Sequence, residues 1–224
     1  KDPIPNEAMP LMGELFESLR LEVKGDTALV DGKPSKFRAE PADAPSLAQL
    51  AARILADTFG PDNRPEDIAA HLSRSFGPAQ QQGELADRDY VTLVMDGPEG
   101  IAAYAQVRRA TPPPCVTTHA PVELYRFYVD RPWQGQGIAQ RLMEAVHAAA
   151  SALGGQSIWL CVWERNPRAI AFYVKCGYRD VGSTPFVLGT DRQTDRVLVA
   201  PVREPTIHST EPATQLATAA SAGS

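Results

Sequence analysis

The segment 128–139 combines residue types and spacings that suit the binding of a phosphate group. It reads Tyr-Val-Asp-Arg-Pro-Trp-Gln-Gly-Gln-Gly-Ile-Ala, with a predicted strand ending at Val129 and a predicted helix opening at Gly135 and Gly137. A helix N-terminus presents unpaired N–H groups and the positive end of the helix dipole, which together favour anions. Glycine removes the side chain where an anion approaches the backbone. The spacing predicts a phosphate loop; the plainer alternative is a glycine-rich turn.

Three known phosphate loops can be compared with this segment. A nucleoside-triphosphate loop ends in Gly-Lys-Ser/Thr, and no lysine follows the glycines here. The dinucleotide fingerprint needs a small residue where Gln140 stands and joins its strand directly to glycine, whereas residues 130–134 intervene here. A dinucleotide-dependent oxidoreductase remains an alternative only if Gln140 is tolerated. The third pattern, Gln/Arg-x-x-Gly-x-Gly/Ala, matches residues 134–139, and this match resembles the pyrophosphate loop of the GCN5-related N-acetyltransferases (GNAT).

A second segment carries the same resemblance. Residues 158–178 end in Asn-Pro-Arg-Ala-Ile-Ala-Phe-Tyr-Val-Lys-Cys-Gly-Tyr, which is similar to a frequent pattern of that family. The likeness covers about residues 36–203 in the order of elements and is specific at 123–178. It implies an α/β (α+β) GNAT fold with a mixed central sheet and helices on both faces. It also implies an acetyl-CoA-dependent N-acetyltransferase that transfers acetyl to a primary amine in a ternary complex.

The resemblance further implies where the cofactor binds. The strand before the loop should splay from the next strand, so that backbone groups of Phe127 and Val129 pair with the pantetheine amides. Arg131 and Arg168 are candidates for phosphate contacts or are solvated arginines, and Asn166 either contacts the cofactor or only caps a helix. The expected cofactor-binding residues are Phe127, Tyr128, Val129, Gln134, Gly135, Gln136, Gly137, Ile138, Ala139, Asn166 and Tyr173.

Two residues are candidates for proton transfer. An alkyl amine is mostly protonated at pH 7, so a base must remove a proton before attack. Glu123 stands before Gln134 at the spacing of the catalytic glutamate in some histone-acetylating members, and the alternative is a surface carboxylate. Unless a bulge intervenes, period-two counting puts Glu123 on the face of Phe127 and Val129. Tyr173 stands at the family's usual general-acid position, or is a packed aromatic residue; an N–H near Val129 would polarise the thioester.

Hydrophobic periodicity places the elements that position these residues. It predicts strands at 36–40, 90–95, 101–108, 122–129, 158–163, 181–188 and 196–202, and helices at 44–59, 65–85 (one or two, with a break at 77–78), 135–153 and 166–176. This order predicts a mixed sheet with helices on both faces. We expect an N-terminal extension at 1–35 with a small hairpin, an acetyltransferase domain at 36–203 and a disordered tail at 204–224.

Composition excludes several classes of partner. There are 22 Lys+Arg against 27 Asp+Glu, a net charge of −5, with the acidity in the two ends, so no basic stripe for nucleic acid is expected. No apolar run approaches the roughly 18 residues of a membrane span, and no secretory signal is readable. The 3 cysteines lack a CxxC pattern and the 4 histidines lack ligand spacing. Reduced thiols in the cytoplasm and no metal are expected, with Cys161 buried in its apolar strand.

The acceptor amine is the least determined feature. Residues 182–195, which end in Gln193, Thr194 and Asp195, are similar to the ending of PaiA-type spermidine/spermine acetyltransferases. A polyamine is therefore one candidate acceptor; a protein N-terminus or lysine is another, and a non-catalytic acyl-CoA sensor is the alternative from a different class. Members of the family are often homodimers. Helix carboxylates that could line a cation site, or simply face solvent, are Glu66, Asp67, Glu84 and Asp87.

Overall fold

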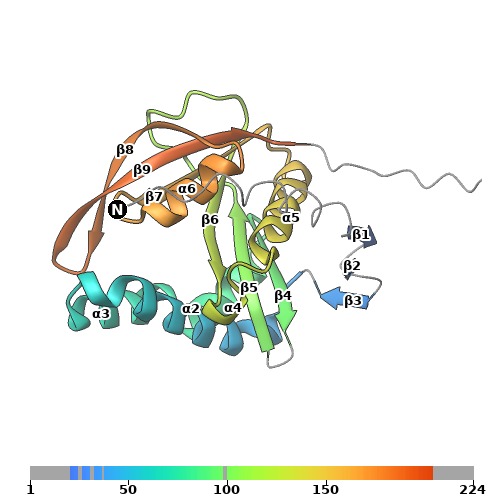
Figure 1. Cartoon of the computed structure of the whole chain (residues 1–224), viewed down its shortest axis with the longest axis horizontal. Helices are drawn as coiled ribbons and strands as arrows, with labels where there is room; N and C mark the ends of the chain where they lie inside the picture. Colours follow the sequence, from blue (N-terminus) through green and yellow to red (C-terminus); the bar gives the residue numbers. More distant parts are fainter. Residues whose placement is uncertain (1–20, 25–26, 31–32, 37, 98–99, 204–224) are drawn as a thin grey trace, which may run out of the picture.

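The computed structural model describes residues 21–24, 27–30, 33–36, 38–97 and 100–203 (Figure 1). A small antiparallel sheet contains β1 (Leu21–Lys24), β2 (Thr27–Val30) and β3 (Lys33–Lys36) in that order. β1 and β2 pair in the region for which the sequence predicts a hairpin. The predicted disordered tail lies outside the described residues, and the limits of the domain stay a prediction.

The main sheet is mixed, with the strand order β4-β5-β6-β7-β9-β8. Its strands are β4 (Tyr90–Gly97), β5 (Gly100–Arg108), β6 (Pro121–Val129), β7 (Ser157–Trp163), β8 (Arg179–Leu188) and β9 (Asp191–Pro201). The helices are α2 (Ala44–Phe59), α3 (Pro65–Ser75), α4 (Pro78–Ala86), α5 (Ile138–Ala152) and α6 (Pro167–Lys175), with short 3-10 turns η2 (Pro41–Asp43), η3 (Gly60–Asp62) and η4 (Arg131–Trp133). β6 and β7 run parallel, whereas the other neighbouring strands are antiparallel.

The predicted fold class is confirmed, and two predicted elements differ. Residues 36–40 do not form a strand of the main sheet: β3 ends at Lys36, and Arg38 makes a single bridge to Leu93. Helix α5 begins at Ile138, not at Gly135, because Gly135 and Gly137 both adopt the left-handed backbone conformation, which a right-handed helix cannot contain.

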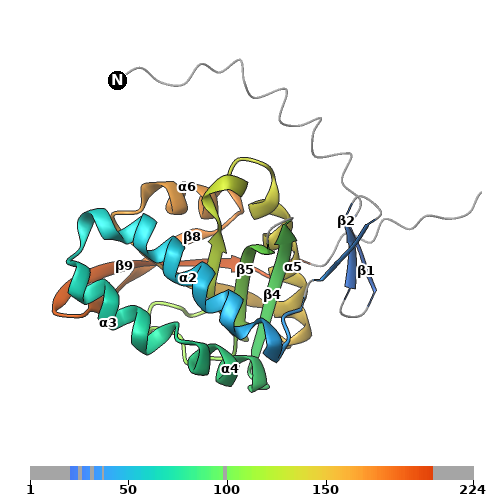
Figure 2. The same ribbon diagram turned by 90° about the horizontal axis from the view of Figure 1, so that it is seen from below.

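Helices cover both faces of the sheet. One core contains Leu142 of α5 and Leu160 of β7, with α6 packed on the same side. The other contains Leu47 of α2 and Tyr104 of β5. Figure 2 shows α2, α3 and α4 together on one side of the strands. The apolar stripe of α2 recurs at helical spacing, so this helix buries one face and leaves the other to water.

A β-bulge interrupts the alternation of side chains along β6. Gln106 pairs with Arg126 and Val107 with Leu124, so Tyr125 has no partner of its own on β5. The extra residue shifts the alternation by one. Phe127 and Leu124 consequently pack into the core beside α5 and α6, and Glu123 faces the other way. The period-two prediction held only if no bulge intervened. Because a bulge is present, Glu123 does not share the face of Phe127 and Val129.

A buried ion pair ties α4 to the sheet. Arg126 of β6 pairs with Glu84 of α4, and their side chains are 2% and 4% exposed. Arg126 also donates to the Gln106 Oε1 atom at 2.7 Å and to the Ser75 carbonyl at 2.5 Å. Gln106 in turn donates to Glu84 Oε2 at 3.0 Å. Glu84 is thus neither a solvated helix residue nor part of an open cation site.

We predict that Glu84→Ala lowers the free energy of unfolding by about 3–5 kcal/mol, because it leaves the Arg126 charge buried without its partner. Urea unfolding followed by circular dichroism measures the change. Glu66→Ala is the matched control: Glu66 is an exposed glutamate on the neighbouring helix, and its loss should cost less than about 1 kcal/mol. Equal losses in the two variants would contradict the assigned role of the ion pair.

Candidate active site

The loop between β6 and α5 presents free backbone donors. Gly135 and Gly137 have φ angles of 81° and 79°, and Gly137 is the N-cap of α5 without a side-chain hydrogen bond. The first N–H groups of a helix have no partner within the helix. A Cβ atom built on either glycine meets no atom within 4 Å, so the space beside both residues is open. The loop therefore offers N–H donors to an anion that approaches closely.

Side chains hold this loop in place from both directions. Gln134 Nε2 donates to the Val129 carbonyl at 2.9 Å. Asp130 accepts from Arg53 Nη2 of α2 at 2.6 Å and from the Arg131 backbone N–H at 2.9 Å. Helix α2 thereby fixes the point at which β6 ends and the loop begins. Such support keeps the donors at fixed positions before any ligand arrives.

A gap opens between β6 and β7. The two strands pair only over residues 121–123 and 157–159, although both continue further. The Asp130 N–H donates to Ala102 of β5 at 2.9 Å. Backbone groups alternate in direction along an antiparallel strand, so those of Phe127 and Val129 point away from β5 and into the gap. An exposed strand edge therefore lies inside the sheet, available to an extended ligand.

A single cavity of about 1170 Å³ joins the loop, the gap and the space between α3 and the β8–β9 hairpin. Most of the predicted site residues line it, namely Glu123, Phe127, Tyr128, Val129, Gln134, Gly135, Gln136, Gly137, Ala139, Asn166 and Tyr173. Arg168 also lines the cavity, whereas Arg131 and Ile138 do not; Ile138 packs against the core instead. Ligand cavities are usually smaller, so this one suits a long ligand together with a second molecule.

Tyr173 lies against the gap within an aromatic cluster. Its ring centroid is 6.1 Å from that of Phe127 and 5.7 Å from that of Tyr178. Burial raises the pKa of the Tyr173 hydroxyl well above its usual range, so the group stays protonated at neutral pH. It is therefore a hydrogen-bond donor. Asn166 accepts from the Ala169 N–H at 3.1 Å and so caps α6, in addition to lining the cavity.

Glu123 lines the cavity as one half of an ion pair. Its Oε2 atom lies 2.5 Å from Arg108 Nε, and Arg108 also donates to the Tyr90 hydroxyl at 2.7 Å. The guanidinium of Arg108 stacks on Tyr125 at 3.5 Å from the ring centroid. Burial raises the pKa of Glu123, and the Arg108 charge opposes that rise. The carboxylate can therefore take up a proton more readily than an exposed glutamate.

The structure adds residues that sequence reasoning did not assign to the site. Cys161, predicted to be buried, is exposed and lines the cavity, as do Trp163, Phe186 and Asp195. Although the side chain is open to the cavity, the protein atoms that surround the Cys161 thiol reduce its hydration and raise its pKa to about 12. Strand alternation in 157–163 assigns Cys161 and Trp163 to one face, but the sequence contains no signal that this face borders a cavity.

The helix carboxylates considered for a cation site do not line the cavity. Asp67 accepts from the Thr190 N–H at 2.9 Å and so supports the β8–β9 turn. Asp87 accepts from the Asp89 N–H at 2.9 Å, and Glu66 is exposed. Those four residues therefore do not form a joint site.

Neither a metal site nor a membrane helix occurs in the part of the chain that the structure describes. No group of three or more histidine, cysteine, aspartate or glutamate side chains there is arranged to hold a metal ion. No helix of the described ranges has the length and apolarity needed to cross a bilayer.

Comparison with known proteins agrees with this geometry. The model of the acetyltransferase (GNAT) family matches residues 52–178. An uncharacterized N-acetyltransferase of Lactobacillus delbrueckii subsp. lactis is 31% identical over 158 residues, which cover 70% of this chain and 90% of the relative. An uncharacterized N-acetyltransferase of Mycobacterium tuberculosis is 33% identical over 159 residues, 70% of this chain and 96% of the relative.

Solved structures share the fold at low sequence identity. The PaiA N-acetyltransferase of Thermoplasma acidophilum, solved in complex with coenzyme A, has a TM-score of 0.60 and 14% identity, covering 75% of this chain and 98% of its own. An aminoglycoside 6'-acetyltransferase type Ii has a TM-score of 0.54 and 16% identity, covering 75% and 96%. The family match and the sequence relatives show that the protein belongs to the GNAT family and is an acetyltransferase.

We predict that Gly137→Ala lowers the free energy of unfolding by roughly 1–2 kcal/mol, because alanine is strained at the positive φ of this position. Gly83→Ala is the matched control: Gly83 lies exposed within α4 with nothing near its Cβ position. That change should raise stability by about 0.5–1 kcal/mol. Thermal or urea unfolding compares the two variants, and a neutral Gly137→Ala would contradict the strained loop geometry.

Proposed function

We propose that this acetyltransferase uses acetyl-CoA and transfers the acetyl group to a primary amine within a ternary complex. The observation that carries the proposal is the single cavity that joins the loop of N–H donors, the strand gap and Tyr173. The N–H groups of residues 135–139 hold the diphosphate, whereas the Gln134 N–H already donates to the Arg131 carbonyl at 3.3 Å. Arg168, which lines the same cavity, adds positive charge. The pantetheine arm lies in the gap, where Phe127 and Val129 offer backbone partners.

The proposed reaction forms a C–N bond and breaks the thioester C–S bond. Glu123 accepts the proton of the bound ammonium, directly or through water, and the neutral amine attacks the carbonyl carbon. The Val129 N–H, which points into the gap, stabilises the oxyanion that develops. As the C–S bond breaks, the nitrogen releases its second proton to solvent, and Tyr173 donates a hydrogen bond or its proton to the departing thiolate of coenzyme A. A Tyr173 that has given up its proton regains one from solvent. The presence of Glu123, Val129 and Tyr173 in the lining of one cavity supports these roles.

Direct transfer is favoured over an acyl-cysteine intermediate. Cys161 is the cysteine that lines the cavity among the described residues, and its pKa is raised to about 12. A thiol with such a pKa is almost wholly protonated at neutral pH, and only the thiolate is a good nucleophile. The amine therefore attacks the thioester itself.

The nature of the acceptor and the location of the enzyme belong to the same proposal. The likeness of residues 182–195 to the PaiA-type ending favours a polyamine as acceptor, whereas the charge and lining of the cavity, considered below, favour a monoamine. The three cysteines are free thiols, and on that ground we propose a reducing, cytoplasmic location.

Calorimetric titration of acetyl-CoA into the protein tests the cofactor site. The wild-type protein should bind, whereas Gly137→Asp should lose measurable affinity, because its carboxylate repels the diphosphate and occupies the open space beside the loop. Gly137→Ala is the matched control: it carries the same backbone strain without the charge and should retain binding. Full affinity in Gly137→Asp would show that the diphosphate binds elsewhere.

Tyr173→Phe tests the leaving-group step. Turnover, followed by release of the coenzyme A thiol, should fall about 10²–10⁴-fold, the usual contribution of a positioned acid, while the affinity for acetyl-CoA stays unchanged. Tyr178→Phe is the matched control: Tyr178 is buried beside Tyr173, donates to the Met143 sulfur and does not line the cavity. Unchanged turnover in Tyr173→Phe would remove this residue from the mechanism.

A further inference from the structure

One part of the cavity lies on the sheet face opposite the core that contains Tyr173. Directly paired residues point to the same face of a sheet. Glu123 pairs with Trp159, Cys161 with Val197, and Trp163 with Asp195. Since successive odd residues of β7 share a face, Glu123, Cys161, Trp163 and Asp195 all face the same way. This part of the cavity, here called the acceptor lobe, is bounded by that face, by α2 and α3, and by the β8–β9 hairpin.

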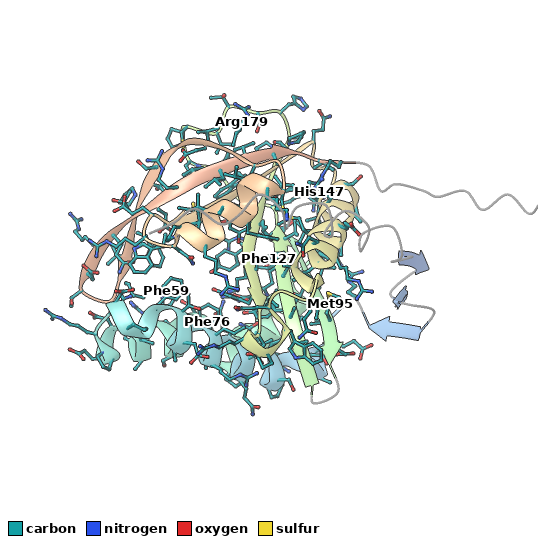
Figure 3. All side chains as sticks on the ribbon, viewed as in Figure 1. Phe59, Phe76, Met95, Phe127, His147 and Arg179 are labelled. Carbon is teal, nitrogen blue, oxygen red and sulfur yellow. The ribbon has the colours of Figure 1, made fainter. Side chains whose placement is uncertain are left out.

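The walls of the acceptor lobe are aromatic. Phe59 at the end of α2 contacts Trp163 with ring centroids 5.6 Å apart. His71 of α3 lies 5.9 Å from Phe186 of β8 and 5.6 Å from Phe76. Figure 3 labels Phe59 and Phe76 on the helix side of the lobe and Phe127 on β6. Rings from the helices thus meet rings from the sheet and the hairpin, and the lobe offers apolar surface for a flat or ring-sized group.

Asp195 is the carboxylate of the lobe that has no protein partner. Glu123 is neutralised by Arg108, and the buried Arg126 is neutralised by Glu84. The Asp195 carboxylate makes no hydrogen bond or ion pair with any residue in the described ranges. Loss of hydration raises its pKa to about 6, so the group is mainly ionised at pH 7. A half-buried charge of this kind is stabilised by a cation that enters the lobe.

Cys161 lies on the sheet face that also carries the carboxylates of Glu123 and Asp195. On β7, Cys161 stands between Trp159, which pairs with Glu123, and Trp163, which pairs with Asp195, so Cys161 lies between the two carboxylates on this face of the sheet. An ammonium group above Cys161 would be attracted by Asp195 and would lie on the same face of the sheet as Glu123, the proposed base. The aromatic walls add cation–π attraction at the same place.

We propose that Asp195 binds the ammonium group of the acceptor above Cys161, an inference that rests on the proposed function. The acceptor is a monoamine with an apolar, ring-sized body. The body lies between the aromatic walls. A polyamine would bring further ammonium groups among these rings, where the residues that the structure describes supply no second unpaired carboxylate to the lobe, and desolvating these groups would cost binding free energy. Asp195 is thus a specificity-determining residue of the acceptor site.

The test measures amine binding separately from turnover. Phenethylamine is titrated into protein saturated with coenzyme A, and its Kd is compared between the wild-type protein and Asp195→Asn. Loss of a charge-assisted hydrogen bond should weaken binding about ten- to a hundredfold. In steady state the KM for phenethylamine should rise by the same factor, whereas kcat and the KM for acetyl-CoA should change little. An unchanged Kd would overturn the proposal.

Two further variants distinguish direct binding of the ammonium group by Asp195 from a general effect of negative charge near the lobe. Glu164→Gln removes a neighbouring exposed carboxylate that does not line the cavity, and it should leave the amine Kd nearly unchanged. Equal weakening in both variants would mean that only the overall negative field matters. Cys161→Phe fills the space above β7 and should abolish amine binding while acetyl-CoA still binds. Retained amine binding in this variant would place the ammonium elsewhere and overturn the proposal.

A panel of amines tests the class of acceptor. Phenethylamine should give a higher kcat/KM than spermidine or a lysine peptide, and a tenfold preference for spermidine would overturn the monoamine assignment. Failure of the proposed function is distinguishable, because it would appear as absence of acetyl-CoA binding in the wild-type protein. If only the acceptor assignment is wrong, the wild-type protein still binds acetyl-CoA.

Discussion

The candidate active site depends on the separation of β6 from β7 after their first paired residues. Parallel strands normally pair along their length, and every backbone group left unpaired inside a protein needs another partner. Here the pairing stops after residues 121–123, and the backbone groups of Phe127 and Val129 face a cavity instead of a neighbouring strand. The same opening joins the anion-binding loop on one side of the sheet to the acceptor lobe on the other. Two substrates can therefore meet through the sheet itself.

Buried charges hold β6 in the position that keeps this gap open. Arg126 is tied to α4 through Glu84, and Arg108 of β5 is tied to β6 through Glu123. Both pairs lie on the side of β6 that faces the α2–α4 layer, beside the bulge at Tyr125. Burying ion pairs rarely adds much net stability, but such pairs define a unique arrangement because a displaced charge would be left unpaired. Electrostatics thus fixes the strand whose far edge borders the cavity.

The chemistry of the cavity is divided between its two sides. The loop side offers backbone donors and Arg168, which suit an anionic nucleotide. The acceptor lobe offers aromatic rings and the Asp195 carboxylate, which suit a cation with an apolar body. The protonated hydroxyl of Tyr173 lies at the gap between them. In the proposed reaction, this separation of charge keeps each substrate in its own half of the cavity and orients the amine toward the thioester.

The sequence by itself determined the mixed sheet, its covering helices and the glycine loop before α5, because these depend on short-range patterns. The periodicity of α2, the glycines at 135 and 137 and the N-cap at Asn166 act locally. Three features became known only from the tertiary structure: the bulge at Tyr125, the ion pair of Glu84 with Arg126, and the position of Asp195 in the cavity lining. Each of these joins residues far apart in the chain, and a one-residue change of register moves a side chain to the opposite face.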